Sequence, residues 1–124
     1  MDANREQLLS LLNLILPEEI LEYFTIVNLE IRPHEVHLFI DEKNSIPEEF
    51  KKEKLISKGF YPESVIQDFP LRDKPLFLHV RLRKWVVEST GKVVSKTWKL
   101  TAEGTRYSKE FASFLKELLG FLPS

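Results

Sequence analysis

The 124-residue chain contains no cysteine, one methionine and only four glycines. Without cysteine, disulfides and thiolate metal sites are excluded. So few glycines argue against a loop that cradles phosphate, and neither a Gly-x-Ser-x-Gly elbow nor a cysteine nucleophile is present. No apolar run approaches the ~20 residues of a membrane span, and the first residues lack the pattern of a signal peptide. We therefore expect a cytoplasmic protein that does not contact a membrane.

Charge is distributed unevenly along the chain although the net charge is only −1. Residues 1–50 carry a net charge of −8 and residues 51–124 carry +7. Such segregation favours an oriented encounter with an anionic partner. The alternative is that the acidic half packs against the basic half, and the sequence leaves both explanations open. The length is typical of one domain, here residues 1–124.

Hydrophobic spacing predicts an α+β fold with helices at its beginning and end. Residues 5–16 show helical periodicity, and Pro17 begins a second short helix. Residues 25–30 and 35–41 are typical of strands that turn around Pro33 and His34. We expect a loop or short helix over 42–54, irregular strand over 57–68 and a turn over 70–75. The final helix, capped by Thr105 or Ser108, should pack on the sheet through an apolar stripe. The stripe is Phe111, Phe114, Leu115 and Leu118.

The most distinctive segment is an alternating strand over 76–87, which we expect to form a long hairpin with 93–100. Alternation places two sets of side chains on opposite faces. The first set is Leu76, Leu78, Val80 and Leu82, and the second is Phe77, His79, Arg81, Arg83 and Trp85. One face can thus lie on a core while the other presents cations beside aromatic rings.

Cations on and after this strand are the candidate DNA-binding residues. They are Arg81, Arg83, Lys84, Lys92, Lys96, Lys99 and Arg106. Lysine and arginine pair with phosphates by releasing counterions, and a β-ribbon can enter a DNA groove. An equally good explanation is an ordinary solvated sheet face with Trp85 and Trp98 buried under the final helix. We expect both tryptophans to be core residues rather than stacking platforms.

Metal binding and catalysis have weaker support. His34, Glu35 and His37 are close in sequence, but strand positions three apart face opposite ways, and His79 is the only other histidine. These are too few ligands for a structural zinc site, so we interpret the pair as one turn and one edge-strand histidine. The glutamates lie where helix starts and solvated loops normally place them. We expect no metal, no cofactor and no enzymatic activity.

Several segments in order resemble one protein family over nearly the whole chain. They are LPEEILEYF at 16–24, SKGFY at 57–61, IQDFPLR at 66–72, AEGTR at 102–106 and KEFA at 109–112. The family is the short N-region proteins encoded with bacterial insertion-sequence transposases of the ISAon type. Residues 68–75 and the basic strand after them are also similar to the N-terminal zinc-finger region of ISL-type transposases. That region has two cysteine pairs, which this chain lacks, so hydrophobic packing at Trp85 would replace the metal.

The resemblance implies a non-catalytic accessory or DNA-recognition role in transposition, with the DDE nuclease in a separate chain. Arg81 and Arg83 would reach phosphates or guanine edges, and the other candidate cations would contact phosphates. A second hypothesis is a protein-interaction subunit that docks on the catalytic transposase or forms a homodimer. It would use the N-terminal helix or the stripe of Phe111, Phe114, Leu118 and Phe121. A third is a remnant without activity.

Overall fold

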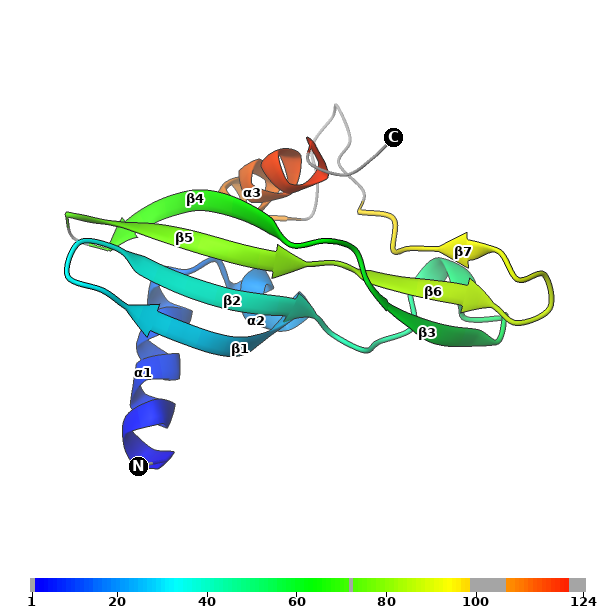
Figure 1. The fold of residues 1–124 in the computed structure, drawn as a ribbon, viewed down its shortest axis with the longest axis horizontal. Helices are drawn as coiled ribbons and strands as arrows, with labels where there is room; N and C mark the ends of the chain where they lie inside the picture. Colours follow the sequence, from blue (N-terminus) through cyan, green and yellow to red (C-terminus); the bar gives the residue numbers. More distant parts are fainter. Residues whose placement is uncertain (1, 72, 99–106, 121–124) are drawn as a thin grey trace.

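The computed structural model describes residues 2–71, 73–98 and 107–120, and Figure 1 shows how its elements are arranged. The fold belongs to the α+β class, as the sequence predicts, because helices precede and follow a run of mostly antiparallel strands. The elements in chain order are α1 (Asp2–Ile15), α2 (Glu18–Tyr23), β1 (Phe24–Ile31), β2 (Val36–Glu42), the short 3-10 helix η1 (Glu48–Phe50), β3 (Leu55–Phe60), β4 (Ser64–Leu71), β5 (Lys74–Arg81), β6 (Arg83–Val87), β7 (Val93–Val94) and α3 (Lys109–Gly120).

The larger sheet, sheet A, consists of two antiparallel hairpins that lie side by side. Its strand order is β1-β2-β5-β4, in which β1 pairs with β2 and β4 pairs with β5. The hairpins meet where β2 and β5 run parallel, with Val36 opposite Leu76 and Asp41 opposite Arg81. We call this β2–β5 boundary the seam. Side-chain contacts that cross the seam tie one hairpin to the other.

One face of sheet A is covered by the helices, and the other face is open (Figure 1). The covered face presents Leu38, Ile40, Leu76, Leu78 and Val80, each at most 1 % exposed. Helix α3 adds the predicted stripe of Phe111, Phe114, Leu115 and Leu118, all of it buried. Every second strand residue and every third or fourth helix residue faces this core. The alternation predicted for the strand and the stripe predicted for the final helix are therefore confirmed.

Sheet B, with strand order β3-β6-β7, extends away from the end of sheet A (Figure 1). Strand β6 continues β5 after Leu82, and β3 leads into β4, so one long antiparallel ribbon runs through both sheets. A backbone hydrogen bond of 2.8 Å from the Tyr61 N–H to the Leu82 carbonyl links the two halves of the ribbon. We call residues 51–60 and 83–94 the arm.

The predicted hairpin between 76–87 and 93–100 exists only as a short β6–β7 pair, and the pairing expected for residues 76–81 is wrong. Strand β5 pairs with β2 and β4, and among the described residues only Val93 and Val94 of the predicted partner pair with β6. The ribbon turns between Leu71 and Lys74, which is shorter than the predicted turn over 70–75. Pro70 is accommodated because β4 is an edge strand of sheet A and its pairing is irregular between Asp68 and Leu71.

Both tryptophans are buried, as predicted, but in different places. Trp98 joins the core under α3, where its ring centroid is 6.1 Å from that of Phe111. Trp85 is 3 % exposed and lies in the arm. In sheet A the buried apolar strand residues are even-numbered, as is Leu82 after β5, whereas in β6 they are Trp85 and Val87. The side of the ribbon that is covered therefore changes where sheet A ends and the arm begins.

Candidate nucleic-acid interface

The arm concentrates positive charge on a part of the molecule that projects from the sheet. Its sequence holds seven lysines and arginines against two glutamates, a net charge of +5. Lys52, Lys58 and Lys92 are exposed, and none of them forms an ion pair with a residue that the structure describes. Lys51 and Lys54 make exposed 3.2 Å ion pairs with neighbouring carboxylates, which contribute little to stability. The arm therefore offers lysines that an external anion can reach.

Two further predicted cations lie against aromatic rings. The Nζ of Lys84, on the arm, is 5.1 Å from the ring centroid of Tyr61. The Nζ of Lys96 is 4.9 Å from the ring centroids of both Tyr23 and Trp98. Lys96 therefore lies where the chain returns to the helices rather than on the arm. Cation–π contacts restrict these ammonium groups without neutralising them.

Arg81, on the open face of sheet A, is paired across the seam. Its Nε and Nη2 donate to the two carboxylate oxygens of Asp41 at 2.7 and 2.6 Å, a bidentate geometry. Hydrogen bonding to Asp41 raises the pKa of the Arg81 guanidinium. The guanidinium also lies 4.3 Å from the ring centroid of Phe60. This arginine holds β2 to β5.

Arg83, the first residue of β6, also forms hydrogen bonds within the chain. Its Nη1 donates to Ser57 Oγ at 2.9 Å, and its Nε and Nη2 both point at the Glu42 carbonyl at 3.4 Å. Its backbone N–H donates to Glu42 Oε1 at 2.8 Å. The guanidinium stacks on the same Phe60 ring as Arg81, 4.6 Å from its centroid, so the two arginines share a side as predicted. Arg81 binds Asp41 and Arg83 binds Glu42, so these two cations of the basic half pair with residues of the acidic half within the fold.

The two remaining candidate cations, Lys99 and Arg106, lie outside the described residues, and Arg32 is paired within the chain. Arg32 is held in the β1–β2 turn by Glu30 at 2.8 Å and Glu35 at 3.2 Å. Every arginine whose side chain the structure describes thus has carboxylate, carbonyl or hydroxyl partners within the chain. Of the predicted DNA-binding lysines, Lys84 and Lys92 lie on the arm. The exposed lysines Lys52 and Lys58 were not predicted, because β3 rather than residues 93–100 is the main partner of β6.

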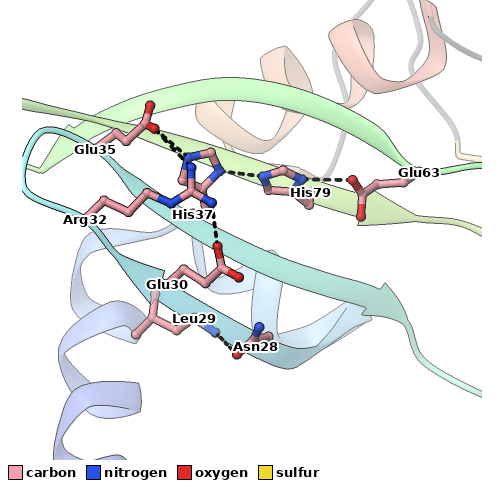
Figure 2. Close-up of polar contacts among 8 residues, drawn as sticks. All are labelled: Asn28, Leu29, Glu30, Arg32, Glu35, His37, Glu63 and His79. Atoms are coloured by element: carbon pink, nitrogen blue, oxygen red, sulfur yellow. Dashed lines mark hydrogen bonds and ion pairs between the residues drawn. The ribbon is translucent and has the colours of Figure 1, made fainter.

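A second cluster, on the open face of sheet A, was also missed (Figure 2). His37 Nδ1 and His79 Nε2 are 2.7 Å apart across the seam. His34 lies in the turn as predicted, but His37 lies in β2, an internal strand, so its assignment to an edge strand is wrong. The sequence could not indicate the contact, because it depends on the parallel pairing of β2 with β5.

Comparison with protein-family models, with curated proteins and with solved structures found no match to this chain. Among the described side chains, no group of three or more histidines and carboxylates is placed to hold a metal ion. None of the helices described is long and apolar enough to span a membrane.

Proposed function

We propose that this protein binds DNA through the arm and acts as a non-catalytic accessory module of an insertion-sequence transposase. The observation that supports this proposal is the charge of +5 on a narrow projection where Lys52, Lys58 and Lys92 are exposed and lack ion-pair partners among the described residues. A projecting β-ribbon has a shape that suits a DNA groove. Lysines at its surface would replace condensed counterions along the phosphate backbone.

The proposed contacts are with the backbone rather than with base edges. For arginine to read guanine its guanidinium fork must be free, and the forks of Arg81 and Arg83, the predicted readers, are occupied by Asp41, Ser57 and Glu42. Phosphate contacts position a protein on DNA but carry no sequence information directly. Lys84, Lys92, Lys52 and Lys58 would make these contacts, with Arg81 and Arg83 fixing the base of the arm.

The accessory role rests on the resemblance to the N-region proteins of insertion sequences. In that arrangement, phosphodiester chemistry belongs to a separate DDE chain, because two-metal catalysis needs convergent carboxylates. The arm would help such a partner to hold DNA. A downstream reading frame that encodes a DDE nuclease would support this part of the proposal, and an unrelated neighbourhood would argue against it.

The test is anisotropy of a labelled duplex titrated with protein between about 50 and 200 mM salt. The variant K58E/K92E should bind at least about tenfold more weakly, with a log–log salt slope smaller by about two. The matched control is K109E/K116E, which makes the same charge change at exposed positions of α3. It should lose much less affinity than the arm variant.

Two duplexes separate backbone contacts from base reading. A terminal inverted repeat and its scrambled counterpart should bind equally well if only phosphates are contacted. A clear preference for the repeat would overturn the backbone-only part of the proposal. No binding of the wild-type protein to either duplex at low salt would overturn DNA binding itself.

A second candidate function, docking on another protein, is favoured by an exposed apolar strip on α1. Leu11, Leu14 and Ile15 are 55 %, 82 % and 46 % exposed, whereas Leu12 and Leu16 on the opposite side are buried. Sedimentation of the wild type and of an L11Q/L14Q variant would test self-association: a dimer dispersed by the variant supports this function, and two monomers argue against a homodimer. The stripe on α3 is buried in the core, and Phe121 lies outside the described residues.

A further inference from the structure

The arm carries three apolar side chains side by side on one face. Ile56 of β3 lies directly opposite Val86 of β6, and Val86 lies directly opposite Val93 of β7. Residues that lie directly opposite each other in antiparallel strands point to the same face of a sheet. The three side chains therefore form a row that crosses all three strands of sheet B. We call Ile56, Val86 and Val93 the apolar row.

A partner can reach the apolar row from outside. Ile56 and Val93, at its two ends, are 50 % and 47 % exposed, and Val86 between them is half-buried. Trp85 and Val87, the neighbours of Val86 along β6, point to the opposite face and are buried. One face of the arm is thus closed, whereas the other presents apolar surface to the outside.

Lysines lie close to the apolar row on β3, on β6 and next to β7. Lys58 on β3 and Lys92, directly before β7, are exposed, and neither forms an ion pair with a residue that the structure describes. Lys84 is two residues from the apolar row along β6 and therefore shares its face. Glu88, which follows β6, is already paired with Lys54 at 3.2 Å. This face suits an anionic partner that has apolar surface between its charges.

A second copy of the chain does not suit the apolar row, whereas a nucleic acid duplex does. The arm of a second copy would bring a net charge of +5 against an equal charge of the same sign. A duplex has the opposite charge, and the walls of its grooves consist of sugars between phosphates. Lysines that reach the phosphates would therefore bring the apolar row against the sugars.

The chemistry of the sugar then separates DNA from RNA. Lysine–phosphate contacts are available in both, but deoxyribose carries only hydrogen at C2′, whereas ribose carries a hydroxyl group that donates and accepts hydrogen bonds. Apolar side chains offer this hydroxyl group no hydrogen-bond partner once water is displaced, and an unpaired polar group is unfavourable. Contact with the apolar row should consequently favour deoxyribose.

We propose that the apolar row packs against deoxyribose and makes the arm selective for DNA over RNA. This selectivity rests on the proposed binding of DNA by the arm, and it supplies what lysine–phosphate contacts cannot supply. Lysine contacts release counterions and weaken as salt rises, whereas apolar contacts release none. A salt series can therefore separate the two contributions to the affinity.

The test compares a DNA duplex with an RNA duplex of the same sequence by anisotropy across a salt series. The wild-type protein should bind DNA at least about fivefold more tightly than RNA. The variant I56T/V93T keeps branched side chains on the strands but places hydroxyl groups in the apolar row. It should lose most of the preference for DNA, while its log–log salt slope on DNA stays that of the wild type.

The matched control is V65T, because Val65 is 42 % exposed on β4, outside the arm. It should keep the wild-type preference for DNA. The wild-type comparison by itself is decisive in one direction: equal affinity for the two duplexes would overturn selectivity and leave binding by the lysines intact.

Other outcomes also contradict the proposal. An equal preference for DNA in the wild type and in I56T/V93T would show that the apolar row does not contact the sugar. Absence of wild-type binding to both duplexes at low salt would overturn the proposed function and the selectivity together. In sedimentation, a wild-type dimer that I56T/V93T disperses would assign the apolar row to a second copy of the chain instead.

Discussion

At the scale of single residues, Glu42 has a buried carboxyl group. This residue ends β2, is 6 % exposed, and binds the backbone of Arg83 where sheet A passes into the arm. Burial raises the pKa of Glu42, against smaller downward effects of the Arg83 N–H hydrogen bond and of the positive charges of Lys96 and Arg83. A raised pKa in the folded state means that folding favours the protonated form. Protonated Glu42 therefore contributes fully to stability below its pKa in the unfolded chain, about 4.3, and this contribution is lost as pH rises through its pKa in the folded protein.

The substitution E42Q should therefore stabilise the protein at neutral pH. Glutamine keeps an oxygen that accepts the Arg83 N–H but removes the charge that burial disfavours. We expect the free energy of unfolding to rise by about 1 kcal/mol at about pH 7, with little gain at about pH 4. Urea unfolding at both pH values measures this difference. E22Q, at an exposed position of α2, is the control; a loss of stability in E42Q at neutral pH would show that attraction to the nearby cations is the larger effect.

At the scale of elements, the start of α3 is bound to α2. The backbone N–H and the hydroxyl of Ser108 donate to the two carboxylate oxygens of Glu19 at 2.6 and 3.0 Å, and Ser108 Oγ accepts from the N–H of Phe111 at 3.3 Å. Burial pushes the pKa of Glu19 up, but hydrogen bonds from Ser108 and from the Glu19 backbone together outweigh it and lower the pKa. Ionised Glu19 therefore contributes to stability above its pKa in the unfolded chain, and this contribution is lost as pH falls through its pKa in the folded protein.

The substitution S108A should destabilise the protein by about 1–2 kcal/mol, because it removes the helix cap and one partner of a buried carboxylate. S113A, at an exposed position of α3, should have no such cost, since alanine favours a helix. Chemical denaturation of both variants at about pH 7 provides the comparison. Equal stability of the two variants would show that Ser108 does not hold α3 in place.

At the scale of the whole molecule, the arm differs from the body, by which we mean the three α-helices and sheet A, in how much apolar surface it buries. The body has one cluster that joins the helices to sheet A and includes Trp98. In the arm, Trp85 and Val87 are buried, while Ile56 and Val93 are 50 % and 47 % exposed. Regions with few buried apolar contacts open at lower free energy than a core does.

The arm should consequently unfold before the body. In the variant W98F, Trp85 is the only tryptophan, and its emission should change at lower urea than the helical circular dichroism of the same sample. In W85F, emission from Trp98 should follow the circular dichroism. Coincident transitions in W98F would mean that the arm and the body unfold as one cooperative unit.

The local pattern of the sequence was sufficient to predict most helices, strands and turns. The leucine spacing in residues 5–16, the prolines at 17 and 33, and the stripe in the final helix predict elements that the structure contains. The buried alternation ending at Leu82 and the cap at Ser108 are also confirmed. These features depend on neighbours within a few residues, so the sequence alone carries them.

Strand pairing and the contacts that depend on it were decided only by the tertiary structure. The β5 part of the alternating strand could have paired with residues that follow β7, but it pairs with β2 and β4. These partners follow from burial of one continuous face, which no local pattern specifies. The parallel register of the seam then brings His37 to His79 and Arg81 to Asp41. From its sequence this protein is an α+β fold with separated charges. The long-range pairing of β2 with β5 determines which charges neutralise each other within the fold and which remain on the arm for a partner.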